Sequence, residues 1–123
     1  NEPISLTDIA RRFEPDNSSY LIQSWLRGRN TIEFLGEWER NNNKQFNEEA
    51  FRKLLKDVRS PSYTLTPKRW IETVNAIGLE SKRGKNGRTM AHPFIACDFE
   101  MWNDMQFRYE VLKYFMSSGI DAK

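Results

Sequence analysis

A tight turn in the last third of the chain restricts the fold more than any other feature. The run Gly84-Lys85-Asn86-Gly87 separates two short extended candidates, residues 79–82 and 88–91. Asn-Gly is the strongest short-range signal for a β-hairpin, because both residues tolerate the positive φ angles of a tight turn. The fold must therefore accommodate one antiparallel hairpin, whatever the remaining residues form.

Helical signals dominate the remaining residues. Apolar side chains recur at helical spacing, and capping residues precede several of these runs. We expect Asn30 to cap the third helix, with Glu33 reaching back to its backbone, and Gly78 to end the helix that contains Ile77. The expected helices span residues 5–13, 19–27, 30–41, 47–58, 66–77, 93–102 and 103–115.

Helices combined with one hairpin indicate an α+β fold, a compact and helix-rich domain with a basic, wing-like β-hairpin. The chain has 123 residues, the size of one ordinary domain, so residues 1–123 are assigned to a single domain. The missing initiator Met fits a domain excised from a longer protein. The last helix is expected to bury an apolar face made of Phe107, Val111, Leu112 and Phe115.

The distribution of charge gives the first functional clue. The chain carries 19 Lys and Arg against 17 Asp and Glu, and a net charge of +2 alone says little about function. However, no acidic residue occurs between Ser81 and Cys97, where the basic residues are Lys82, Arg83, Lys85, Arg88 and His92. A projecting turn with such a cluster suits phosphate oxygens, and Arg can also pair with guanine edges. From the residues alone, a phosphate contact and an inert solvated loop remain equal alternatives.

Two further basic positions are weaker candidates. Lys68 and Arg69 lie in the first turn of the helix that Thr66 is expected to cap, where they oppose the helix dipole unless an anion binds there. Simple exposure is the favoured reading of this pair. His92 precedes Pro93 at the start of another helix, a position typical of a cap or a hydrogen-bonded surface residue.

The sequence argues against catalysis, metal binding and membrane insertion. Cys97 is the single cysteine, and His92, Cys97 and Asp98 do not have a recognised metal-ligand spacing. Nucleophile elbows, phosphate-binding loops and dinucleotide fingerprints are absent from the sequence, so neither an enzyme nor a cofactor is expected. No stretch approaches the ~20 apolar residues of a membrane span. No signal peptide is visible, which favours a cytoplasmic location.

An ordered series of short motifs resembles the KilA-N domain of phages, bacteria and large DNA viruses. The matching segments are Ser5-Leu6-Thr7-Asp8-Ile9-Ala10, Trp25-Leu26-Arg27, Thr31-Ile32-Glu33-Phe34-Leu35-Gly36, Trp38-Glu39, Phe46-Asn47, Leu65-Thr66-Pro67, Trp70-Ile71-Glu72, Asn75-Ala76-Ile77-Gly78, Ser81-Lys82, Gly84, Gly87, Thr89, Ala91-His92, Ile95-Ala96 and Phe99 to Trp102. The resemblance covers roughly residues 4 to 116.

This resemblance implies a DNA-binding role and a fold related to the fungal APSES domains, in which helices and a hairpin wing approach DNA. It makes the hairpin cations the leading contact candidates and strengthens the case for Lys68 and Arg69. The family usually has Gly-Arg-Tyr-Gly-Gly-Thr at the turn. Here the turn reads Gly84-Lys85-Asn86-Gly87-Arg88-Thr89, which keeps the basic character but lacks the aromatic residue and the third glycine.

The sequence thus favours a double-stranded DNA-binding domain, with a transcriptional or phage-related role and a place in the bacterial or phage cytoplasm or nucleoid. Alternatives are an RNA-binding domain and a protein-interaction module that presents Glu37, Glu39, Glu48 and Glu49 to a basic partner. The oligomeric state stays open. The predicted nucleic-acid-binding residues are Lys68, Arg69, Lys82, Arg83, Lys85, Asn86, Arg88 and His92.

Overall fold

The hairpin that the turn predicts is present in the computed structural model, which describes residues 2–82 and 87–118. Strands β2 (Leu79–Lys82) and β3 (Arg88–Ala91) pair antiparallel, with Lys82 opposite Arg88 and Leu79 opposite Ala91. A short strand, β1 (Ile4–Ser5), pairs with the other edge of β3, so the sheet order is β1-β3-β2. The predicted strand bounds are therefore confirmed, and the remaining described elements are helical.

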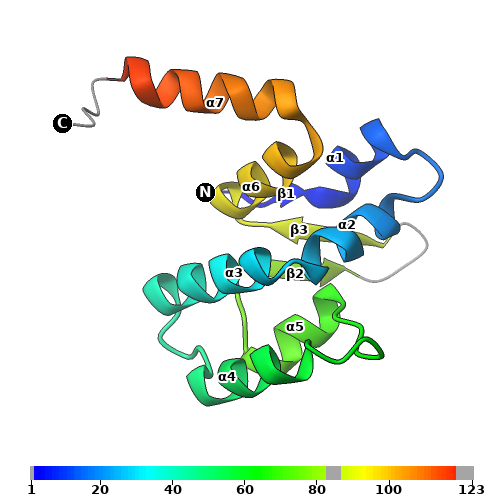
Figure 1. The fold of residues 1–123 in the computed structure, drawn as a ribbon, viewed down its shortest axis with the longest axis vertical. Coiled ribbons are helices and arrows are strands. Elements are labelled where there is room, and N and C mark those ends of the chain that lie inside the picture. Colours follow the sequence, from blue (N-terminus) through cyan, green and yellow to red (C-terminus); the bar gives the residue numbers. More distant parts are fainter. Residues whose placement is uncertain (1, 83–86, 119–123) are drawn as a thin grey trace.

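The predicted α+β class is also confirmed, with a small antiparallel sheet and helices around it (Figure 1). None of the helices in the described ranges is long and apolar enough to cross a membrane. The helices are α1 (Leu6–Phe13), α2 (Ser18–Arg27), α3 (Arg29–Asn42), α4 (Glu48–Asp57), α5 (Pro67–Val74), α6 (Pro93–Asn103) and α7 (Met105–Ser117).

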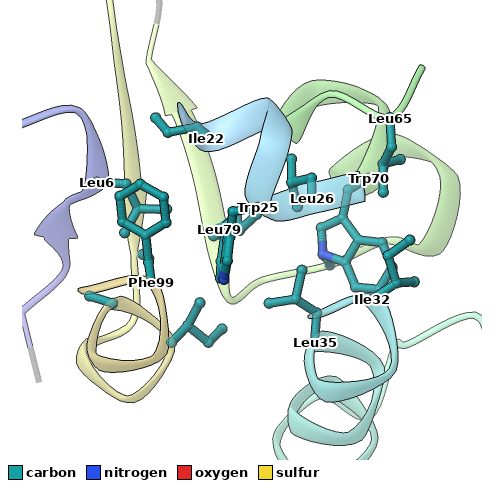
Figure 2. Close-up of a cluster of buried hydrophobic side chains, with 14 of the residues drawn as sticks. Leu6, Ile22, Trp25, Leu26, Ile32, Leu35, Leu65, Trp70, Leu79 and Phe99 are labelled. Atoms are coloured by element: carbon teal, nitrogen blue, oxygen red, sulfur yellow. The ribbon is translucent and has the colours of Figure 1, made fainter. Parts of the chain in front are cut away.

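The hydrophobic core lies between the sheet and the helices, and two tryptophans occupy its centre (Figure 2). Trp25 of α2 packs edge-on against Phe99 of α6, with ring centroids 5.0 Å apart, and its indole Nε1 donates to Asp98 Oδ2 at 3.0 Å. Trp70 of α5 lies beside the apolar side chains of α3, where Leu35 is fully buried. Burial of these large rings fixes α2, α5 and α6 around the hairpin.

The start of α3 differs from the prediction. The helix begins at Arg29, so Asn30 lies inside it and does not cap it; Gly28 is the N-cap residue. Glu33 does not bind the backbone at the helix start. Its Oε2 instead accepts a hydrogen bond from the side-chain Nε of Arg29 at 2.6 Å. A single residue connects α2 and α3, which leaves no space for the expected cap.

The end of α5 also differs. This helix stops at Val74, and Asn75 terminates it in the left-handed conformation with φ of 58°. Asn tolerates this conformation better than most residues, so it takes the role assigned to Gly78. Ile77 consequently leaves the helix and is 54% exposed instead of lining its buried face. The chain therefore turns towards β2 three residues earlier than predicted.

Helix α7 does not bury the apolar face expected of it. The structure classes none of its residues as buried, and Leu112 and Phe115 are 50% and 45% exposed. Figure 1 shows why, because α7 follows α6 and extends away from the body of the domain. The apolar stripe is real in sequence, but most of the helix has no neighbouring element to cover it.

Candidate nucleic-acid interface

Helix α1 holds the base of the hairpin in place. The backbone N–H of Thr89 donates to Thr7 Oγ1 at 2.9 Å, and the Thr7 side chain is almost fully buried. The neighbouring residues are paired as well, since the guanidinium of Arg88 donates to Asp8 Oδ1. Ser5 caps the helix that carries both groups, since its Oγ accepts from Asp8 N–H at 3.0 Å. The described base of the hairpin is therefore held against α1.

The pairing with Asp8 changes the predicted charge of the hairpin. Arg88 was predicted as a nucleic-acid contact in a stretch of sequence without acids, yet the structure places a carboxylate from 80 residues away against it. Arg11 Nη1 also lies 3.8 Å from the same Asp8 oxygen. Two cations thus share one carboxylate, so Arg11, Arg88 and Asp8 together carry a net charge of +1. Asp8 is 57% exposed at its side chain, so it organises the two arginines without burying them.

A polar hollow of about 290 Å³ lies between α1, the start of α2 and the hairpin root. Three cations line it, from Arg11, Lys82 and Arg88. Hydroxyl groups complete the lining, from Thr7, Ser18, Ser19, Ser81 and Thr89. Cations and hydroxyls are the groups that contact nucleic-acid phosphates, so the hollow has the chemistry of a phosphate site and room for one.

The start of α2 adds to this chemistry. Its N-cap residue, Asn17, makes no side-chain hydrogen bond to the first turn within the described chain. The first backbone N–H groups of a helix lack helical partners and carry the positive end of its dipole. Because Ser18 and Ser19 line the hollow, the uncapped turn of α2 opens towards the same place as the three cations. An anion bound there would meet partial positive charge as well as full charges.

Helix α5, where the sequence predicted a phosphate contact, offers less. Thr66 Oγ1 already accepts from Arg69 N–H at 3.1 Å, and Pro67 has no N–H to donate. The guanidinium of Arg69 donates to Thr64 O at 3.0 Å and lies 5.1 Å from the centre of the Tyr63 ring. Arg69 is thus folded onto the preceding loop and does not line the hollow.

Lys68 is exposed and lines a different depression on the other side of β2. Two carboxylates, Glu72 and Glu80, line this depression as well, so its charge is mixed. The structure therefore does not bring Lys68 together with Lys82, and we rank it below the three cations of the hollow.

His92 lies at the end of β3 remote from the turn, about 13 Å of strand from Arg88. It acts as the cap of α6: its Nδ1 accepts from Phe94 N–H at 3.1 Å, and its own N–H donates to Gly78 O at 2.9 Å. The remaining predicted contacts, Arg83, Lys85 and Asn86, lie outside the described residues.

Sequence reasoning missed the contributions of Arg11, Ser18 and Ser19. All three belong to the first two helices, at least 60 residues before the hairpin, so no local pattern connects them with it. The available signal was the Asp8–Arg11 spacing, which places opposite charges one helical turn apart on the polar face of α1.

The acidic surface proposed for a basic protein partner is largely used within the domain. Glu39 was expected on a solvated face, but it is fully buried and binds backbone N–H groups. Arg40 Nε and Nη2 donate to the two oxygens of Glu48 at 2.7 and 2.8 Å, and these hydrogen bonds hold the pKa of Glu48 below its ordinary value. Glu37 contacts the same guanidinium at 2.8 Å. The four acids therefore do not form one free acidic face.

Comparison with known families adds one result. A family model described as the KilA-N domain matches residues 1–118. No curated protein and no solved structure gives a significant match.

Proposed function

The chain belongs to the KilA-N domain family, and from this premise we propose that it binds double-stranded DNA through the root and turn of its basic hairpin. KilA-N domains are generally DNA-binding and not catalytic. The observation that carries the proposal is the hollow in which Arg11, Lys82 and Arg88 meet the uncapped start of α2. A backbone phosphate seated there would orient the duplex so that the hairpin enters a groove.

Lys82 and Gly87, which flank the turn in sequence, both line this hollow. Arg83, Lys85 and Asn86 come immediately after Lys82 in sequence, so we assign them to the same contact surface. In this proposal the root cations neutralise phosphates, and an arginine or asparagine of the turn meets base edges. Lys68 is a peripheral phosphate contact, while Arg69 and His92 act in the fold and stay outside the surface. A role in transcriptional or phage-related regulation, in the cytoplasm or nucleoid, fits this activity.

A competition experiment tests duplex DNA against the alternatives of RNA and single strands. We expect a random-sequence duplex to displace a labelled duplex from the protein, and equal nucleotide concentrations of single-stranded DNA or RNA to compete at least about fivefold less well. A hairpin that docks in a groove needs the wide major groove of B-form DNA, which A-form RNA does not offer. Stronger competition by RNA, or no retention of any nucleic acid at moderate salt, would exclude the proposal.

Asp8 gives a sharper test, because it is the acid that moderates the hollow. Asp8→Asn keeps a polar partner for Arg88 but removes one negative charge, so we expect binding to duplex DNA to tighten about threefold to fivefold at moderate salt. The slope of log affinity against log salt should steepen by about one unit. Fluorescence anisotropy across a salt series measures both quantities.

The matched control is Asp57→Asn on α4, which removes the same charge from an exposed pair with Lys53 at 3.1 Å. It should leave the slope unchanged. Weaker binding by Asp8→Asn, with a shallower slope than the control, would show that the arginines of the hollow do not meet phosphate.

A further inference from the structure

A second hollow, of about 480 Å³, lies at the end of the sheet remote from the hairpin turn. It is formed by the C-terminal half of α3 and the start of α6, where His92 and Phe94 follow strand β3. Strand β3 separates this hollow from Arg88 by the length of the strand. Nothing in the proposed DNA contact uses these residues.

Aromatic rings form the floor of the hollow. The rings of Phe34 and Phe94 are stacked, with centroids 5.9 Å apart and an interplanar angle of 16°. The ring centroids of Trp38 and His92 lie 5.0 Å apart. Phe94 is 61% exposed, although it is a large apolar residue on a well-packed helix. An exposed aromatic face beside a hollow is typical of a site that is covered when a ligand binds.

The rim offers hydrogen-bond acceptors. Asn41 Nδ2 donates to Glu37 O at 2.7 Å and to Glu37 Oε2 at 2.8 Å, and Asn42 Nδ2 donates to Trp38 O at 2.8 Å. Asn41 thus uses both amide hydrogens on α3 and Asn42 uses one of its two, and the side-chain oxygen of each asparagine can accept. His92 Nδ1 already accepts from Phe94 N–H, so the ring offers its face and Nε2 to the hollow.

The rim also carries a carboxylate. Glu37 Oε1 accepts from Arg40 Nη1 at 2.8 Å, and Arg40 also donates two hydrogen bonds to Glu48, which Arg52 Nε approaches to 3.7 Å. Within this group of four charges, Glu37 is the one that lines the hollow. Aromatic faces, carbonyl-type acceptors and a carboxylate together recognise a planar cation, and they repel a phosphate. A guanidinium can stack on Phe94 and donate to several acceptors at once, which a point-like ammonium does not do as well.

We propose that this hollow binds an arginine side chain of a partner protein. The arginine would lay its guanidinium on the exposed ring of Phe94, which Phe34 supports from behind, and donate to Glu37 and the asparagine oxygens. The domain would then hold DNA at one end of its sheet and a basic protein segment at the other.

Titration of the ¹⁵N-labelled domain with N-acetyl-arginine methylamide tests this proposal. We expect a saturable shift of the Trp38 indole N–H and of the backbone amides around Glu37 and Phe94, with a millimolar dissociation constant, as suits a single side chain. The citrulline analogue has the same shape without the charge and should bind at least about fivefold more weakly. Adenosine monophosphate serves as the probe for a stacked nucleobase.

Variants distinguish a defined arginine site from nonspecific binding to the protein surface. Glu37→Gln and Phe94→Ala should each weaken arginine binding at least about threefold, because each removes one recognition element. Glu33→Gln, an exposed acid one turn earlier on α3, should leave it unchanged. Equal binding of the citrulline analogue, preference for adenosine monophosphate, shifts that spread over other surfaces, or no saturation would each overturn the proposal.

Discussion

Alanine replacement of Arg11, Lys82 and Arg88 together should weaken binding to duplex DNA about a hundredfold at 0.15 M salt. These three side chains supply the cations of the hollow at the hairpin root. Each phosphate contact that is lost should flatten the slope of log affinity against log salt by about 0.9, so the triple variant should lose between two and three units. Asp8 remains in the variant and repels the phosphate further, which is why the expected loss exceeds that of simple charge removal.

The control for this experiment is a second triple variant, Arg52→Ala with Lys53→Ala and Lys56→Ala. It removes the same number of charges from α4, which packs on α3 and α5 and not on the hairpin. Anisotropy titrations with one labelled duplex, repeated across salt concentrations, compare the two. Circular dichroism shows whether both remain folded; we expect little change, because surface ion pairs such as Arg88–Asp8 contribute at most about 1 kcal/mol. Equal losses in the two variants would mean that overall charge, and not the hollow, attracts DNA.

Local signals predicted the elements whose ends depend on a few neighbouring residues. The Asn-Gly turn placed both hairpin strands at their observed bounds, and Thr66 caps α5 as the sequence predicted. The errors at Asn30 and Gly78 arose where two residues of suitable type lie close together and the tertiary structure selects one. Asn75 rather than Gly78 ends α5. Gly78 has another position to fill, because it lies so close to the side chains of Trp38 and Ile95 that a Cβ atom would not fit there.

The candidate site was less accessible to sequence reasoning. A stretch without acids between residues 81 and 97 correctly identified a basic hairpin, but it could not show that Asp8 neutralises part of it. The sequence also did not reveal the contribution of Ser18 and Ser19, because it depends on how α2 packs beside the hairpin root. Sequence patterns report charge along the chain, whereas binding depends on charges that the fold brings together.

Glu39 is another residue whose role the sequence pattern did not reveal. In the structure it anchors the hairpin. Its side chain is fully buried, and Oε2 accepts from Gly78 N–H at 2.7 Å while Oε1 accepts from Ile77 N–H at 3.0 Å. Asn43 Nδ2 donates to Oε1 at 2.8 Å as well. The carboxylate therefore fixes the two residues that lead into β2, and a Cβ atom on Gly78 would lie 2.8 Å from Oε2.

Replacing Glu39 by alanine should lower the free energy of unfolding by about 4 kcal/mol, because it leaves buried N–H donors unpaired and opens a cavity. For a domain of this size that corresponds to a melting temperature about 10–15 °C lower. Urea denaturation followed by tryptophan fluorescence measures the loss. Glu39→Gln should lose about half as much, because one amide oxygen still accepts while the amide nitrogen opposes a donor.

Glu49→Ala provides the comparison, since Glu49 is an exposed acid in the first turn of α4 and should cost no more than about 1 kcal/mol through the helix dipole. Amide hydrogen exchange then separates an anchor from a general core residue. If Glu39 fixes the entry to the hairpin, the amides of Ile77, Gly78 and Leu79 should lose protection in Glu39→Gln before those around Trp25 do. A uniform loss over the whole domain would contradict the anchoring role. So would a destabilisation no larger than that of Glu49→Ala, because the donors of Asn43, Ile77 and Gly78 would then be satisfied without the carboxylate.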